Sequence, residues 1–315
     1  MQLQMRRYDS PEDYWRIRSF LRQVFVANGG RELSWQAYRF DYWRWHGIEN
    51  MGHGRLEHDV FIWETQDGDI RAVLNREGPG QAFLQVHPDG RSPELEEEMI
   101  ATAEQHLAAG TTHGRRKASI WVNREDRLRQ ASLKGRGYER EQSPEHARRR
   151  SLSVPIADVS IPDGYHIRAL GDVDEHPARS RVSWKAFHPN APDDEYEGAD
   201  WYANVQRAPL YRRDLDLVAV APTGEFASFC TIWFDDCTRS GAFEPVGTAP
   251  AHQQRGLGKA LMCEGLRRLQ GLGATLAFVG SFSPAAHALY AAAGFTEYEI
   301  SDPWSKTIQT PRPSP

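Results

Sequence analysis

The sequence predicts an α/β (α+β) protein of two tandem domains, each a mixed and mostly antiparallel sheet flanked by helices. The chain has 315 residues, about twice the length of a common compact domain. Segments with the spacing of strands alternate with segments with the spacing of helices. The order of these segments repeats between the two halves, which indicates two similar domains rather than one large one.

The repeat can be followed in three pairs of segments. Residues 58–70 and 215–226 both have the pattern strand, glycine-containing turn, strand. Residues 81–88 align with 241–248 and share the pattern Ala-Phe-x-x-Val. Residues 118–139 align on the segment that ends at Phe295, which brings Gly137 onto Gly294. Each half is therefore expected to run helices, hairpin, strand, helix, strand, helix, strand.

A stretch with prolines at 155 and 162 separates the two halves. We predict a first domain over 1–155, a linker over 156–163 and a second domain over 164–315. The aromatic run at 34–47 is expected to form a helix packed on a sheet or on the other domain, since large aromatic rings dominate protein cores. The three arginines at 148–150 are expected to lie on a solvated strand edge.

Composition argues against several kinds of partner. A formal net charge of -5 gives no bulk attraction to nucleic acid or to anionic lipid. The longest apolar stretches, such as 215–221, have the length of strands, so no membrane helix is expected. The N-terminus lacks the pattern of a secretory signal, which favours a cytoplasmic location. The cysteines show no metal-ligand spacing, so we expect reduced thiols and no metal at Cys230, Cys237 and Cys263.

The most informative segment follows a strand that is expected to end near Thr248. The run Gln-Gln-Arg-Gly-Leu-Gly at 253–258 opens a helix with apolar residues at helical spacing. Gly256 lets the backbone approach a ligand closely, while the free amide groups of a helix start favour an anion. Arg255 and Lys259 add positive charge at the same end. The segment predicts a pyrophosphate site, although its spacing fits neither common nucleotide-binding glycine motif.

The pattern QxxGxG at 253–258, followed some thirty residues later by AHALYAAAGF at 286–295, resembles the GNAT superfamily of N-acetyltransferases. The resemblance implies that the loop binds the pyrophosphate of acyl-CoA through backbone amides, with acetyl-CoA as co-substrate. It implies that Tyr290 is the general acid toward the departing thiolate. The CoA-binding residues implied in this way are Val246, Gly247 and Thr248 for the thioester carbonyl and pantetheine, and Gln253, Gln254, Arg255, Gly256, Leu257, Gly258 and Lys259 for the pyrophosphate.

The reaction also needs a base, because an amine must lose a proton before or during its attack on the thioester. Glu244, on the strand before the loop, is the candidate that the resemblance favours; the alternative is a salt-bridged structural glutamate. Lesser candidates are Asp235, His188 and His252. Ser283 stands where the family frequently has an Asn that contacts the pantetheine arm.

The first half lacks these groups. Through the repeat, Glu244 aligns with Leu84 and Tyr290 with Leu133, and neither leucine can exchange a proton. The loop at 87–99 has no QxxGxG, and its helix start is expected to have Ser92 as N-cap and Pro93 at the first position. Several glutamates there would repel a pyrophosphate. We therefore expect a degenerate first domain that shapes the substrate cleft or a dimer surface.

The sequence as a whole favours an acyl-CoA-dependent N-acyltransferase that passes acetyl to a primary amine by direct attack in a ternary complex. The acceptor can be a small molecule or a protein amine, and the chain a monomer or a homodimer. One alternative is a non-catalytic acyl-CoA sensor. Another is an enzyme like mycothiol synthase, a tandem member of the family with one degenerate domain. Cys230 and Cys263 are expected to be buried, which argues against an acyl-cysteine route.

Overall fold

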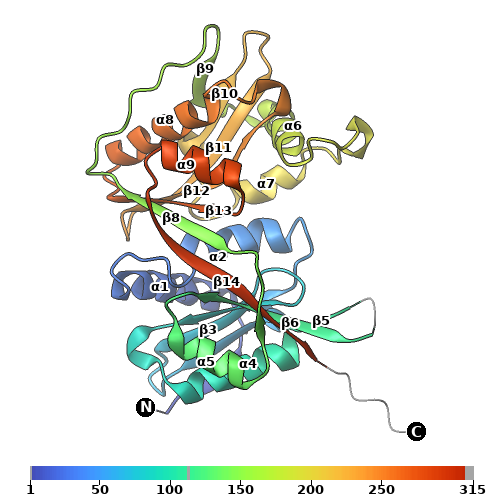
Figure 1. Ribbon diagram of the computed structural model, residues 1–315, viewed down its shortest axis with the longest axis vertical. Coiled ribbons are helices and arrows are strands. Elements are labelled where there is room, and N and C mark those ends of the chain that lie inside the picture. The colour runs from blue at the N-terminus through green and yellow to red at the C-terminus, as the bar shows by residue number, and fades with distance from the viewer. Residues whose placement is uncertain (1, 112–113, 309–315) are drawn as a thin grey trace. The chain divides into compact units, whose positions relative to one another are not determined.

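The computed structural model describes residues 2–111 and 114–308, and the chain divides into two compact units (Figure 1). The first unit comprises the residues up to 146 together with those from 299 onward, and the second comprises Ala147–Tyr298. The chain thus enters the second unit within strand β8 (Glu145–Ser151), ahead of the predicted linker, and leaves it within strand β14 (Glu297–Ile308). No helix in the described ranges is long and apolar enough to span a bilayer.

The first unit has the predicted mixed sheet, with strand order β1-β2-β3-β4-β6-β14. All neighbours in this order run antiparallel except β4 and β6, which are parallel. Its other elements are β1 (Gln4–Arg7), α1 (Pro11–Ala27), α2 (Ala37–Tyr42), a π-helical turn (Trp43–Ile48), α3 (Leu56–Asp59), β2 (Val60–Glu64), β3 (Ile70–Arg76), β4 (Gln81–Val86), α4 (Pro93–His106), β5 (Ala109–Gly110), β6 (Arg116–Asn123), α5 (Arg127–Gly135) and β7 (Glu139–Arg140).

The second unit repeats this plan, with strand order β8-β13-β12-β11-β10-β9. The strands β12 and β13 are parallel, whereas β9, β10, β11 and β12 pair in antiparallel fashion. The remaining elements are β9 (His166–Ala169), α6 (His176–Phe187), α7 (Trp201–Gln206), β10 (Asp216–Val220), β11 (Phe226–Asp235), β12 (Ser240–Thr248), α8 (Leu257–Gly271), β13 (Leu276–Ser281) and α9 (Pro284–Ala292). The predicted fold class and the repeat are therefore confirmed.

Each sheet is covered by helices on both faces (Figure 1). In the second unit, α8 and α9 bury one face with residues such as Leu261 and Leu266, while α6 and α7 bury the other with Val182 and Tyr202. In the first unit, α4 and α5 occupy one face and α1 and α2 the other. Strands covered on both faces are apolar along their whole length, which explains why β10 and β11 show little alternation in the sequence.

The aromatic run belongs to the core of the first unit. Trp35, Phe40 and Trp43 are at most 3% exposed and pack with α1 against the sheet, as predicted. Large rings contribute much of the buried apolar area of a small core. These residues therefore stabilise the first unit.

The prediction of a solvated edge at 148–150 is wrong for two of the three arginines. Arg148 and Arg150 are 8% and 5% exposed. Arg150 donates a hydrogen bond of 2.6 Å to the carbonyl of Ala293, and Arg148 donates one of 3.1 Å to the carbonyl of Phe295. Carbonyls at and just after the end of α9 have no helical partner, so the two guanidinium groups satisfy them. Arg150 also donates to the carbonyls of Val154 and Pro155, whereas its buried Nε has no hydrogen-bond partner among the described residues.

Candidate active site

The two parallel strands at the centre of the second unit separate along their length. β12 and β13 pair from Ser240 to Ala242 on one strand and from Leu276 to Phe278 on the other, and no further register pair joins them. β12 nevertheless continues to Thr248. The backbone of residues 243–248 therefore has an edge toward β13 that no strand pairing uses, and such an edge can hydrogen-bond an extended ligand. The predicted pantetheine-binding residues 246–248 lie on this edge.

A β-bulge places Glu244 on the same strand. The pairing of β11 with β12 shifts by one residue between Cys230 and Ile232, so that Glu244 and Pro245 together lie opposite Thr231. Such an extra residue bends a strand and re-aims its side chains. Trp233 holds the bulge by donating a hydrogen bond of 2.6 Å from its indole Nε1 to the carbonyl of Glu244. The side chain of Glu244 is half-buried.

Tyr290, on α9, is 7% exposed and packs in the core beneath α8. Burial raises the pKa of its phenol, and the charge of Glu244 raises it further. The two residues proposed to handle protons therefore interact electrostatically. In the described part of the chain the hydroxyl of Tyr290 makes no hydrogen bond, which leaves it available to a ligand. The phenol is therefore protonated at neutral pH and holds a proton that it can donate, while its raised pKa makes it a weaker acid than a free tyrosine.

The start of α8 is open to an anion. Gly256 is its N-cap with φ of 79°, a conformation that favours glycine, and no side chain caps the helix. The first backbone bond at this end runs from the N–H of Ala260 to the carbonyl of Gly256. Within the described ranges, the N–H groups of residues 254–259 have no acceptor. These donors and the positive end of the helix dipole give the loop the features of the anion site that the sequence predicts.

Close packing fixes this loop to the site. A Cβ on Gly258 would lie 3.3 Å from Leu289, the neighbour of Tyr290, and 3.6 Å from the hydroxyl of Thr248. On β12, a Cβ at Gly247 would lie 2.6 Å from the ring of Phe229. Gly258 therefore allows the loop to lie close to α9 and β12, and Gly247 allows β12 to pack against Phe229 of β11.

His252, a lesser candidate for the base, has a partner on each of its ring nitrogens. Its Nε2 lies 2.7 Å from a carboxylate oxygen of Glu225, and its Nδ1 lies 2.9 Å from the hydroxyl of Tyr165. Arg255 donates to the same hydroxyl at 3.4 Å, and Gln253 donates to the carbonyl of Thr248 at 3.1 Å. Sequence reasoning missed Tyr165 and Glu225, because their contact with the loop joins positions far apart in the chain.

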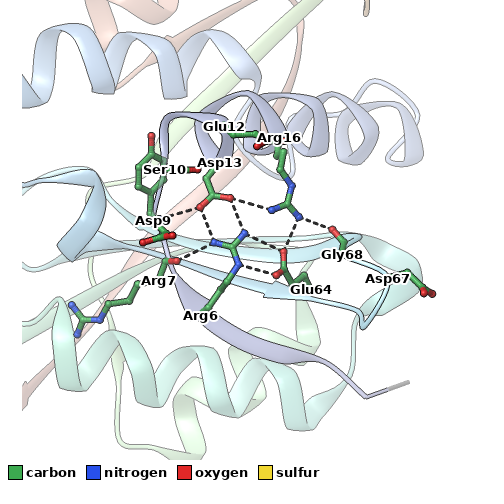
Figure 2. A pocket seen from close by; sticks show the side chains of 11 residues that line it. Arg6, Arg7, Asp9, Ser10, Glu12, Asp13, Arg16, Glu64, Asp67 and Gly68 are labelled. Carbon is green, nitrogen blue, oxygen red and sulfur yellow. Dashed lines mark hydrogen bonds and ion pairs between the residues drawn. The ribbon is translucent and has the colours of Figure 1, made fainter.

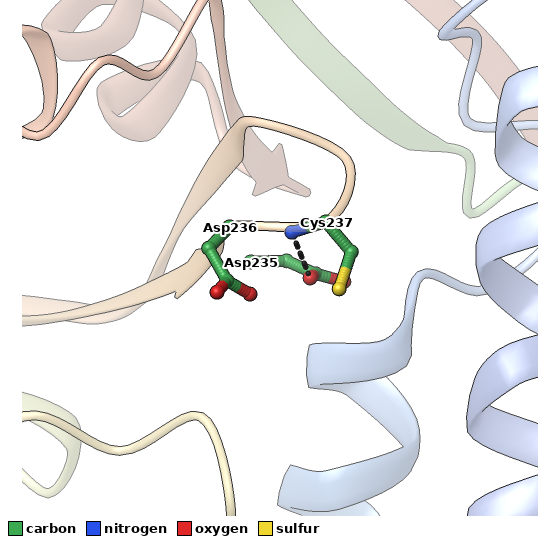
Figure 3. A group of neighbouring side chains, drawn as sticks. All are labelled: Asp235, Asp236 and Cys237. Carbon is green, nitrogen blue, oxygen red and sulfur yellow. Dashed lines mark hydrogen bonds between the residues drawn. The ribbon is translucent and has the colours of Figure 1, made fainter.

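The other candidates lie in different settings. His188 follows the end of α6 and is exposed, with Nδ1 3.2 Å from the carbonyl of Trp184. Asp235 ends β11 and is followed in the turn by Asp236 and Cys237, each of the three offering one potential ligand atom within 4.8 Å of the others (Figure 3). Its carboxylate accepts a hydrogen bond from the N–H of Cys237. Three ligands, two of them exposed, are fewer than Ca²⁺ or Mg²⁺ requires, so the turn carries no metal assignment.

Two of the cysteines are core residues. Cys230 and Cys263 are both fully buried. Burial raises the pKa of each thiol above its ordinary value. A buried thiol with a raised pKa is a poor nucleophile, as expected from the sequence.

A pocket of about 730 Å³ lies in the first unit at the start of α1, and charged side chains of its lining pair with one another (Figure 2). Arg6 lies between Asp13 at 2.7 Å and Glu64 at 2.8 Å. Arg16 extends from α1 to the same Glu64, also at 2.7 Å, and to the carbonyl of Gly68. The charges compensate one another within the network, so we regard it as a structural tie between α1 and the sheet.

Comparison with known proteins agrees with the geometry. Residues 180–295 match the model of the acetyltransferase (GNAT) family, so the second unit carries a GNAT acetyltransferase domain. A mycothiol acetyltransferase of Salinispora tropica is 31% identical over 160 residues, which cover 48% of this chain and 50% of that protein. A mycothiol acetyltransferase of Kineococcus radiotolerans is 27% identical over 234 residues, covering 70% and 71%. The chain thus spans about half the length of the first of these relatives.

Solved structures extend the likeness to the whole fold. A GCN5-related N-acetyltransferase from Sphaerobacter thermophilus aligns with a TM-score of 0.66 at 19% identity, over 98% of this chain and 96% of that one. A tandem GNAT protein from the clavulanic acid biosynthesis pathway aligns with a TM-score of 0.66 at 15% identity, over 100% of each chain. At such identity the alignments establish the fold alone. The protein therefore has a two-domain GNAT-like fold.

Proposed function

We propose that the protein is an N-acetyltransferase that transfers the acetyl group of acetyl-CoA to a primary amine. The observation that carries this proposal is the open helix start at residues 254–259 beside the pair of Tyr290 and Glu244. The loop supplies donors for a diphosphate, and the pair supplies the two proton-transfer groups that amide formation from a thioester requires. The GNAT domain at 180–295 contains all of these residues.

The reaction proceeds by direct attack in a ternary complex. The amine nitrogen forms a bond to the thioester carbonyl carbon while the backbone of residues 246–248 holds the carbonyl and the pantetheine arm. Glu244, directly or through a water, accepts the proton that the amine loses. The carbon–sulfur bond then breaks, and Tyr290 gives its phenolic proton to the departing thiolate. Ser283, at the N-cap of α9, would contact the pantetheine arm where the family frequently has an Asn.

The first domain is assigned no catalytic step in this proposal. Leu84 and Leu133 take the positions of the base and the acid, and both are at most 3% exposed within the core. The start of α4 is already compensated by its own carboxylates. We therefore expect one acetyl-CoA per chain, bound in the second unit.

For the acceptor, the relatives favour one candidate over a general amine. Both relatives named above are mycothiol acetyltransferases, so an amine precursor of mycothiol is the second, more specific candidate substrate. Small amines and protein amines remain the broader class. A direct comparison of turnover between that precursor and other amines decides between the two.

The test measures release of the CoA thiol from acetyl-CoA in the presence of a panel of amines, together with calorimetry of CoA binding. Steady thiol release that depends on an amine, with one CoA bound per chain, is the expected result. Tight binding of CoA without turnover across the whole panel would instead identify a non-catalytic sensor. Two tightly bound CoA molecules per chain would contradict the role given to the first domain.

A further inference from the structure

The first unit has its own pocket where its two parallel strands separate. β4 and β6 pair at Gln81 with Ser119 and at Ala82 with Ile120, although the strands continue to Val86 and Asn123. A pocket of about 240 Å³ lies at these strand ends. Its lining includes Arg31, Val86, Arg91, Asn123, Glu125 and Arg129. Its volume suits a molecule of the size of an amino acid.

Asn123 has an unused donor in this pocket. The residue is 8% exposed, and its carbonyl Oδ1 accepts a hydrogen bond of 2.8 Å from the N–H of Glu125. This bond fixes the orientation of the amide, so the other atom is the nitrogen Nδ2. Among the described residues, Nδ2 is buried and has no hydrogen-bond partner. A buried donor without an acceptor lowers stability, and an oxygen atom of a ligand would remove that cost.

Three arginines add donors around the same space. Arg91 contacts Glu96 and Asp126, each at 2.7 Å, and Arg129 contacts Glu96 at 2.9 Å. Arg31 contacts Glu125 at 2.6 Å and Glu299 at 2.7 Å. In each guanidinium the Nε and one terminal nitrogen make these bonds. Within the described chain, the Nη1 atoms of the three arginines donate no hydrogen bond.

The charges of the pocket select against a polyanion. The three guanidinium groups that line the pocket are all ion-paired, with Glu125 and Asp126 in the lining and with Glu96 and Glu299 outside it. A diphosphate would find no unpaired cation there and would meet the carboxylates of Glu125 and Asp126, although single oxygen atoms would still find N–H donors. The pocket therefore suits a ligand that carries an acceptor but no net charge.

The donors and the carboxylates differ in depth. Asn123 and Arg129 are 8% and 6% exposed, whereas the side chain of Glu125 is 73% exposed. Donors thus lie at the inner end of the pocket, and the exposed carboxylate of Glu125, which contacts Arg31 on one oxygen, lies at its mouth. Leu33 and Val86 supply apolar wall between them. We propose that this pocket binds a zwitterionic amino acid, with the carboxylate at Asn123 and Arg129 and the ammonium group at Glu125.

The experiment uses the full chain, labelled with ¹⁵N, and the probes glycine, alanine and valine. The side-chain amide resonance of Asn123 reports directly on the proposed contact. We expect at least one probe to shift this resonance with saturation and to raise the melting temperature. Propionate, which lacks the ammonium group, and isobutylamine, which lacks the carboxylate, should bind at least tenfold more weakly. Equal binding of either single-charge probe would overturn the proposal.

The variant Asn123→Asp keeps the acceptor for the N–H of Glu125 and the shape of the side chain but loses the donor. It should weaken binding of the best amino acid at least tenfold, and Glu125→Gln, which changes an exposed residue, should weaken it several-fold. Asn204→Asp, on α7 in the other unit, is the matched control and should bind as the unchanged protein does. Should Asn123→Asp fail to fold, Glu125→Gln alone decides.

Three further results would refute the site. One is that none of the three amino acids moves the Asn123 resonance. Another is that Glu125→Gln binds them unchanged. The third is that acetyl-CoA, rather than an amino acid, moves the resonance with saturation, because that would show a second CoA site in the first unit.

Discussion

The starts of α4 and α8 occupy equivalent places in the two units but are compensated differently. At α4, the hydroxyl of Ser92 accepts a hydrogen bond of 3.2 Å from the N–H of Leu95, as the sequence predicted. Buried Glu96 adds a carboxylate to the same turn. At α8 the N-cap is Gly256, which has no side chain to do the same. One helix start is thus satisfied from within the protein, and the other keeps its donors for a ligand.

The strands that precede these helices also differ, since β4 pairs regularly with its neighbour and β12 contains a bulge. The register of β3 with β4 is continuous from Ala72 to Arg76, whereas that of β11 with β12 shifts at the bulge. On the regular strand Leu84 lies in the core, and on the bulged strand Glu244 interacts with Tyr290. A single extra residue in one strand, together with two substitutions, therefore accounts for much of the difference between a structural copy and a candidate active site.

We expect the largest effect from removing Glu96, the buried carboxylate at the start of α4 that has no counterpart at α8. Glu96→Gln leaves Arg91 and Arg129 without their shared buried carboxylate, and we expect the free energy of unfolding of the first unit to fall by about 3–5 kcal/mol. Denaturant unfolding followed by fluorescence measures it. Glu94→Gln, which changes an exposed carboxylate in the same turn, is the control. Equal stability of the two variants would contradict the role assigned to Glu96.

The effect of Glu96→Gln should depend on pH. Burial alone would raise the pKa of Glu96, but the ion pairs with Arg129 and Arg91 outweigh it and hold the pKa below its ordinary value of 4.5. A carboxyl group with a lowered pKa in the folded state stabilises the protein above its unfolded pKa, and that stabilisation disappears as pH falls through the folded value. The difference between the original protein and the variant should therefore shrink below pH 4.5.

We expect the next largest effect from replacing Tyr290, the proposed proton donor. Tyr290→Phe should lower kcat about 100- to 1000-fold, since general acid catalysis contributes factors of this order. Tyr138→Phe is the matched change in the first unit, where the hydroxyl is buried without a partner among the described residues, and it should leave kcat within about twofold. Steady-state thiol release measures both. Near-normal turnover in Tyr290→Phe would exclude the phenol as the acid.

We expect a smaller effect, on CoA binding, from placing a negative charge at Gly256 at the start of α8. Gly256→Glu should weaken CoA binding about tenfold or more, because a carboxylate would occupy the positive end of α8 and repel the diphosphate. Gly256→Ala is the control that separates the effect of charge from that of backbone strain. Its methyl group would meet no atom within 4 Å, but alanine would be strained at a φ of 79°, as glutamate would be. Calorimetry compares the two. Equal affinities would show that charge at this position is irrelevant to binding.

We expect the smallest effect from replacing the N-cap serines Ser92 and Ser283. Each caps a helix that begins with proline, one in each unit, and so they form a matched pair. Ser92→Ala and Ser283→Ala each remove a hydroxyl that accepts a helix N–H, at 3.2 Å from Leu95 and 3.3 Å from Ala286. Each change should cost about 1 kcal/mol of stability. Only Ser283→Ala should also raise the KM for acetyl-CoA, by a few-fold. An unchanged KM would remove Ser283 from the proposed binding residues.

Some parts of the site could be predicted because they depend on local sequence. The spacing of two glycines before an amphipathic helix predicts the free donors of residues 254–259, and the N-cap of α4 follows from Ser92 and Pro93. The burial of Arg148 and Arg150 could not be predicted, since their carbonyl partners lie more than a hundred residues away. The same limit applies to the contacts of His252 and to the unpartnered amide of Asn123.

The sequence by itself determined that the chain has two related halves, that a glycine-rich helix start follows a strand in the second, and that proton-transfer groups are missing from the first. These features rest on periodicity and on residue chemistry within short segments. Only the tertiary structure decided where the units divide, that the parallel strands separate in both, and that Glu244 lies at a bulge of β12, where its charge raises the pKa of Tyr290. Register and burial depend on contacts between distant segments, and a linear pattern does not specify them.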